Sequence, residues 1–114
     1  MKLKLMFFLP FFILGFFLTS CSNKIDKRLG DPRVLVFTKT AGFKHASIPD
    51  GVKAIQKLGL THGFRVDTTS ISAKFTEDTL KQYSAIIFMS TTGDILNTRE
   101  QVEFQRYIQS GGGY

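Results

Sequence analysis

Two continuous apolar runs constrain the fold of this chain more than any other feature. The first is "RVLVFT", residues 33–38, and the second is "SAIIFMST", residues 84–91. Neither run alternates apolar with polar side chains, so each predicts a strand that is covered on both faces. Strands of this kind belong to parallel sheets whose two faces are packed against helices.

Helix signals follow the first run. Ser47 and Asp50 form an S-x-x-D box, and Pro49 falls in the first turn, where its missing N–H costs little. Either Gly59 or Gly63 offers an end. The sequence therefore predicts a capped helix between the first strand and the next.

A second strand is predicted over "FRVDTTSI", residues 64–71, and a short helix capped by Thr76 runs to about Gln82. A third helix follows the second apolar run and ends at "SGGG". Its cap is either Asn97 with Glu100 or Thr98 with Gln101.

The alternation of strands with helices predicts an α/β domain with a doubly wound, mostly parallel sheet in the order 2-1-3 and right-handed crossovers. Three glycines end the last helix, and Tyr114 follows them. In α/β domains this pattern is typical of the start of the next strand. We therefore expect residues 33–114 to be the N-terminal part of a domain that continues beyond Tyr114.

The first twenty residues read as an export signal. Two lysines precede fourteen mostly apolar residues, Leu5 to Leu18, which is too short for a span of about 20 residues. "LTSC" resembles a bacterial lipoprotein processing site, at which the only cysteine, Cys21, would be acylated. The alternative is an ordinary secreted protein with a cysteine near its cleavage site. We expect a signal peptide over 1–20, a lipid-anchored tether over 21–32, and a place in the bacterial cell envelope, on either face.

Charge excludes one class of partner. Without the signal the chain has 13 basic and 9 acidic side chains, which is only modestly basic. Zinc-ligand spacing and interleaved basic and aromatic residues are both missing, so nucleic-acid binding is not expected.

Ligands of open α/β sheets bind beyond the carboxyl ends of the strands, where the strand order reverses. The loops "TKTAGFKHAS", residues 38–47, and "STTGDILN", residues 90–97, should face each other there. Neither holds a Walker or dinucleotide motif, so no nucleotide cofactor is predicted. Lys39 and Lys44 could hold an anion beside the helix N-terminus. Thr38, Thr40, Thr91 and Thr92 are turn formers that could also touch a ligand.

His45 is the leading candidate in this site, as an acid/base, a hydrogen-bond donor or a ligand of a divalent metal, unless it only packs on its loop. Asp94 could orient His45, bind a sugar hydroxyl or ligate a metal, unless it is only a turn residue. His62 lies about 21 Å away along the predicted helix and cannot join His45 at one metal.

The two loops resemble the trehalose-utilisation (ThuA-like) family. Its paired motifs are filled by Gly42, Phe43, Lys44, His45 and Ser47 in one loop, and by Thr91, Thr92, Gly93 and Asp94 in the other. Lys44 stands where the family often has arginine. The lysine keeps the positive charge but loses the bidentate hydrogen-bonding geometry of arginine.

The resemblance implies a flavodoxin-like, class I glutamine-amidotransferase-like fold without the amidotransferase triad, and a role in sugar utilisation. The first hypothesis is an enzyme acting on a saccharide or modified sugar, with His45 as acid/base or metal ligand and Asp94 as its catalytic partner. Two alternatives remain: a non-catalytic glycan-binding or scaffold domain, and an anion- or nucleotide-binding flavodoxin-like module, which is less favoured because the phosphate motifs are absent. The ligand-binding residues that we expect are Lys39, Gly42, Phe43, Lys44, Ser47, Thr91, Thr92 and Gly93.

Overall fold

A computed structural model describes residues 30–114. The signal peptide, Cys21 and most of the predicted tether lie outside these residues. The elements are β1 (Arg33–Phe37), α1 (Ile48–His62), β2 (Arg65–Thr69), the 3₁₀ turn η1 (Ser72–Lys74), α2 (Glu77–Leu80), β3 (Ala85–Phe88) and α3 (Thr98–Gln109).

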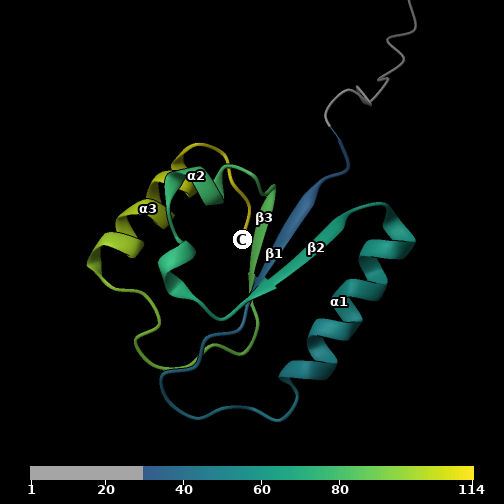
Figure 1. The fold of residues 1–114 in the computed structure, drawn as a ribbon, viewed down its shortest axis with the longest axis horizontal. Coiled ribbons are helices and arrows are strands. Elements are labelled where there is room, and N and C mark those ends of the chain that lie inside the picture. The colour runs from purple at the N-terminus through teal and green to yellow at the C-terminus, as the bar shows by residue number, and fades with distance from the viewer. Residues whose placement is uncertain (1–29) are drawn as a thin grey trace, which may run out of the picture.

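The three strands form one parallel sheet in the order β2-β1-β3. This is the predicted order, and it is the one that flavodoxin-like sheets adopt around β1. Helix α1 covers one face of the sheet, and α2 and α3 cover the other (Figure 1). The predicted three-layer α/β architecture is therefore confirmed.

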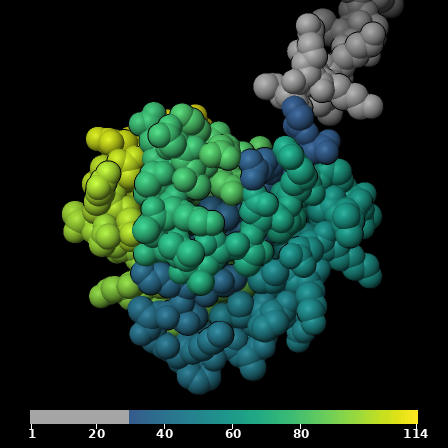
Figure 2. All heavy atoms as spheres, viewed as in Figure 1, coloured from purple at the N-terminus to yellow at the C-terminus, as the bar shows by residue number. Residues whose placement is uncertain are grey.

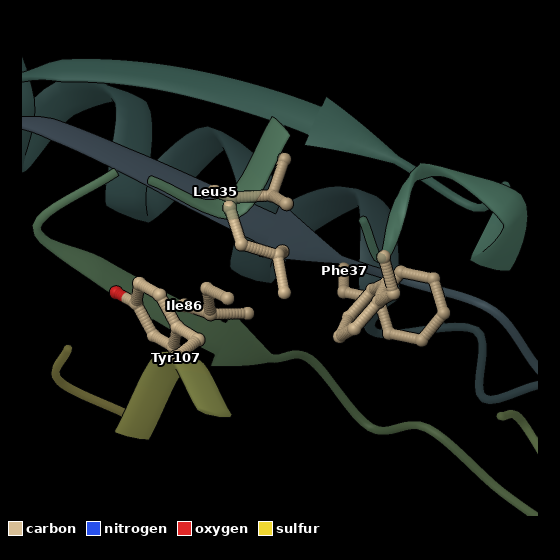
Figure 3. Close-up of a cluster of buried hydrophobic side chains, with 6 residues drawn as sticks. Leu35, Phe37, Ile86 and Tyr107 are labelled. Atoms are coloured by element: carbon tan, nitrogen blue, oxygen red, sulfur yellow. The ribbon is translucent and has the colours of Figure 1, made fainter. Parts of the chain in front are cut away.

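The main core lies between the sheet and α2 and α3. Leu35 and Phe37 of β1 pair in register with Ile86 and Phe88 of β3, so these side chains share one face. Tyr107 of α3 packs against the same cluster (Figure 3). Phe75, which precedes α2, and Leu80 complete the buried cluster. The predicted burial on both faces holds for residues 35–37 of β1, whereas in β3 only Ile86 is fully buried.

Helix α1 packs closely on the sheet because two of its residues are glycines. A Cβ at Gly59 would lie 2.9 Å from Val66 Cγ2 of β2, and one at Gly51 would lie 2.7 Å from Met89 Sδ after β3. The helix ends at Gly63, which is in the left-handed conformation at φ +72°. Gly59, the other predicted end, is buried inside the helix instead.

The predicted capping box at Ser47 is wrong. Ser47 precedes α1 but has helical backbone angles, φ −73° and ψ −12°, and its side chain makes no cap hydrogen bond. A capping side chain reaches the N2 or N3 amide from an extended backbone, which Ser47 lacks. The other two caps are as predicted. Thr76 accepts from the Thr79 amide, and Asn97 with Glu100 forms the capping box of α3.

The chain after α3 returns to the sheet. Gly113 makes a parallel bridge to Ala85 on the outer edge of β3, with its carbonyl accepting from the Ile86 amide at 2.9 Å. A Cβ at Gly112 would lie 2.2 Å from the ring of Tyr107. The glycines thus allow the backbone to cross that ring and reach the sheet. None of the helices in residues 30–114 has the length and apolar character needed to cross a membrane.

Candidate functional site

The loops after β1 and β3 meet at the carboxyl ends of their strands, as predicted (Figure 1). Thr40 and Thr92 form an isolated parallel bridge. The Thr92 carbonyl accepts from the amides of Ala41 and Gly42 at 2.8 and 3.2 Å. The Thr92 hydroxyl donates to the Phe43 carbonyl at 2.7 Å. These contacts make a joint between two loops that are 49 residues apart in the sequence.

Glycine permits the close approach at this joint. Gly93 has φ +74°, and a Cβ there would lie 3.1 Å from the Gly42 nitrogen and 3.2 Å from Ala41 Cβ. Ser90, at the start of the same loop, has φ +48° and is the only non-glycine residue with positive φ in residues 30–114. A side chain in this region is uncommon and costs conformational energy. Sequence reasoning did not single out Ser90, because no pattern of residue types marks a left-handed serine.

The first loop presents an aromatic surface to solvent. Phe43 is 72% exposed, and its ring meets that of His45 edge to face, with centroids 5.0 Å apart and an interplanar angle of 83°. Lys44, between them, is exposed as well. Figure 2 shows this part of the chain, in blue, over the lower part of the surface. The loop therefore offers an apolar ring, a cation and an imidazole side by side.

The other predicted site residues fall into three groups. Exposed side chains are those of Ser47 and Asp94, and the backbones of Gly42 and Gly93 are exposed with them. Thr91 and Thr92 are half-buried. Lys39 is engaged within the chain, because its Nζ donates to Ser72 Oγ of η1 at 2.7 Å. Lys39 therefore tethers η1 to the end of β1.

His45 and Asp94 belong to the two joined loops, but no hydrogen bond or ion pair links them in the described part of the chain. Within residues 30–114 no three His, Cys, Asp or Glu side chains gather in a way that could hold a metal ion. The residues around His45 thus do not form a metal-ligand set. The chemistry available on this surface is hydrogen bonding, charge and ring contact.

Two surface hollows lie away from the joint. One of about 390 Å³ is lined mainly by α2 and α3, including Leu80, Glu103 and Tyr107. The other, of about 500 Å³, is lined by the last part of α1 and the start of β2. The joint itself is an open surface on residues 30–114 and lines neither hollow.

A polar network ties the sheet together at the opposite end of the strands. Arg33 of β1 and Tyr83, before β3, both donate to Asp67 Oδ2 of β2, the tyrosine at 3.0 Å. The guanidinium lies 5.1 Å from the Tyr83 ring centroid. The hydrogen bond from Arg33 lowers the pKa of Asp67, and burial, with the bond to Asp67, raises the pKa of Tyr83. The network joins all three strands and serves the fold.

Comparison with known proteins identifies the domain. The family model "ThuA: Trehalose utilisation" matches residues 33–114, which run from the start of β1 through both loops to Tyr114. The curated proteins and the solved structures gave no match. The family match covers every strand and helix of the sheet domain and both sides of the joint. The chain therefore belongs to the ThuA family of trehalose-utilisation proteins.

Proposed function

We propose that this chain is a lipid-anchored envelope protein whose ThuA domain binds or processes a sugar or sugar derivative at the joint between the loops after β1 and β3. The family gives it a role in carbohydrate utilisation. One observation supports placing the binding site at the joint. The Thr40–Thr92 bridge fixes two polar loops together at the edge of the sheet where doubly wound folds bind ligands.

The exposed groups suit a sugar. A pyranose ring has a face of C–H groups and a rim of hydroxyls, so it needs an apolar contact and several hydrogen-bonding partners. The Phe43 ring supplies the apolar contact, and Lys44 can donate to a hydroxyl. Asp94 accepts from hydroxyls, and His45 can do either. A neutral, hydroxyl-rich ligand therefore uses this surface more fully than a phosphate, for which no motif exists.

Two forms of this function differ in what His45 does. In an enzyme, His45 acts as a general acid/base on the bound sugar, with Asp94 of the other loop as its partner. In a non-catalytic glycan-binding or scaffold domain, both residues only hold hydroxyls. The open surface at the joint is compatible with each form.

The binding experiment uses the full chain in detergent micelles and titrates trehalose, maltose, glucose and their oxidised forms by calorimetry. We expect Phe43→Ala to weaken binding roughly ten-fold, since it removes a ring contact of about 1–1.5 kcal/mol. His62→Ala is the matched control, because His62 is an exposed histidine at the end of α1. Binding of none of these sugars, or binding that Phe43→Ala leaves unchanged, would contradict the proposed site.

Turnover separates the two forms. Products are followed by chromatography in the parent and in His45→Ala. Loss of turnover with retained binding assigns catalysis to His45. Weaker binding in His45→Ala, with no turnover in the parent, favours the glycan-binding form.

The lipid anchor is tested at Cys21. Acylation of the only thiol explains its presence in an exported chain, and two or three acyl chains give stable anchoring where one is marginal. We expect the parent to incorporate labelled palmitate and to sediment with membranes, and Cys21→Ala to do neither. Label in Cys21→Ala would rule out this anchor.

A further inference from the structure

The outer edge of β2 is open in the described part of the chain. β2 pairs only with β1 among residues 30–114. The Arg65 amide donates to the Pro32 carbonyl, and the Thr69 carbonyl accepts from the Thr38 amide. In a parallel ladder alternate residues direct both backbone groups to the same neighbour. Residues 65, 67 and 69 therefore face β1, and Val66 and Thr68 direct their N–H and C=O groups outward.

An apolar rim lies along this open edge. The hollow of about 500 Å³ is lined by Gln56, Leu60, Phe64, Arg65, Val66 and Asp67. Leu60, on the flank of α1 beside β2, is 89% exposed. Natural proteins usually protect an open edge with charge, proline or a covering segment, because it is a template for another strand. Here an exposed leucine lies next to backbone groups that have no strand partner among residues 30–114.

The charges along β2 favour a second copy as that partner. Arg65 and Asp67 lie on the same face of the strand, two residues apart, with Val66 between them. In an antiparallel pair of two β2 strands whose two-fold axis passes Val66, each Arg65 stands opposite Asp67 of the other copy. Asp67 Oδ2 already accepts from Arg33 and Tyr83 of its own copy, so the second Arg65 meets the other carboxylate oxygen. An axis at residue 67 would set two aspartates opposite each other, which is unfavourable. The edge is therefore self-complementary when the axis passes Val66.

From this geometry we infer that two copies of the chain associate through antiparallel pairing of their β2 strands, centred on Val66. The pairing joins two three-stranded sheets into one continuous sheet. Val66 then forms a hydrogen-bonded pair with its own symmetry mate. Thr68 stands opposite Phe64, whose amide already donates to the Gly59 carbonyl at the end of α1, so the ladder is centred on Val66. Leu60 lies on the α1 face, where the α1 helices of the two copies come side by side and cover the apolar hollow. The site at the joint stays outside this interface.

Disulfide trapping of the full chain in membranes tests the register. The hydrogen-bonded pair at the axis has Cα atoms about 5.5 Å apart, which is within disulfide reach. We expect Val66→Cys to give roughly five-fold more disulfide dimer under mild oxidation than Lys57→Cys, whose side chain is on the exposed face of α1. Cys21 is retained in every variant, and the parent chain reports its own background. Peptide mapping should join position 66 to position 66.

Two further substitutions, each made with Val66→Cys, separate the interface from chance collision. Leu60→Glu and Arg65→Asp should each reduce the trapped dimer to the Lys57→Cys level, the second because it places aspartate opposite Asp67. Leu58→Glu is the control, since Leu58 is 51% exposed on α1 but does not line the hollow. Circular dichroism verifies that each variant is folded. Trapping no stronger than in Lys57→Cys, or equal trapping in Leu60→Glu and Leu58→Glu, would overturn the inference.

Discussion

The hydroxyl of Thr92 donates a 2.7 Å hydrogen bond to the carbonyl oxygen of Phe43, across two loops that the sequence separates by 49 residues. We expect Thr92→Val to lower the free energy of unfolding by about 0.5–1.5 kcal/mol, because the valine keeps the shape but leaves that carbonyl unpaired. Urea denaturation measures the change.

Thr91→Val is the matched control for this bond. Thr91 is half-buried like Thr92, and the structure gives its side chain no hydrogen bond within residues 30–114. Its replacement should change stability by less than about 0.5 kcal/mol. Equal losses in the two variants would mean that the bond to Phe43 contributes nothing of its own.

Gly93 combines a left-handed backbone with a close neighbour, and a second glycine separates the two effects. Gly63 has nearly the same φ, +72° against +74°, but a Cβ there would meet nothing within 4 Å. Gly63→Ala should cost about 1 kcal/mol for the backbone alone. Gly93→Ala should cost roughly 2–3 kcal/mol, since its Cβ also crowds the Gly42 nitrogen. Thermal and urea unfolding give both values, and similar costs would show that the joint can relax.

Asp67 should make stability depend on acid pH. Its pKa is lowered in the folded chain, first by the hydrogen bond from Arg33, so the unfolded chain takes up this proton at higher pH. The contribution of ionised Asp67 to the free energy of unfolding is therefore complete above the ordinary aspartate pKa of about 3.9. It is lost as the pH falls through the lowered pKa of Asp67 in the folded chain. Asp67→Asn should lower the free energy of unfolding by about 1 kcal/mol at pH 7. The loss is modest because solvent screens the partly exposed pair with Arg33.

The acid-pH prediction is measured as urea stability at pH 7 and at successively lower pH. The gap between parent and Asp67→Asn should close as the parent aspartate becomes protonated. Asp78→Asn serves as a comparison, because both Asp78 and its partner Lys81 have exposed side chains, and this pair should show a smaller change. A gap that stays constant with pH would place the effect of Asp67 in packing and not in its charge.

Ser47 before α1 and Asn97 before α3 look alike in sequence, because each is followed three residues later by an acidic residue. Only Asn97 makes a cap hydrogen bond, so the two substitutions should differ in cost. Asn97→Ala breaks the reciprocal bonds with Glu100, whose side chain is buried, and should cost about 1 kcal/mol. Ser47→Ala removes no cap bond and should cost less than about 0.5 kcal/mol. Calorimetric unfolding of both variants decides, and a larger loss for Ser47→Ala would indicate that its hydroxyl caps α1 in solution.

The strands, their order and the meeting of the two loops could be predicted from the sequence, because apolar runs and alternation with helices are local signals that a parallel sheet converts into one arrangement. Ser47 shows where this stops. A cap depends on backbone angles, and those of Ser47 are helical and not extended, which its residue type does not indicate. The residue types alone matched a capping box.

The same limit applies to Lys39 and to Asp67. The prediction that Lys39 binds a ligand is untested. The hydrogen bond from its amine to Ser72, on a turn that no sequence signal indicated, could not be predicted. Asp67 looked like a residue of an ordinary strand until the register brought Arg33 and Tyr83 to it. The partners of such side chains depend on the register of the strands and on the path of the loops. Neither can be deduced from the spacing of neighbouring residues in the sequence.

The joint between the two loops is made almost entirely of main-chain groups and of small residues, whereas Phe43, Lys44, His45 and Asp94 project from it without holding it together. Replacing those four side chains should therefore leave the framework intact. Under the proposed function, such a site can change the molecules that it accepts by ordinary point substitutions while the protein keeps folding, since selection for ligand and selection for stability act on different atoms.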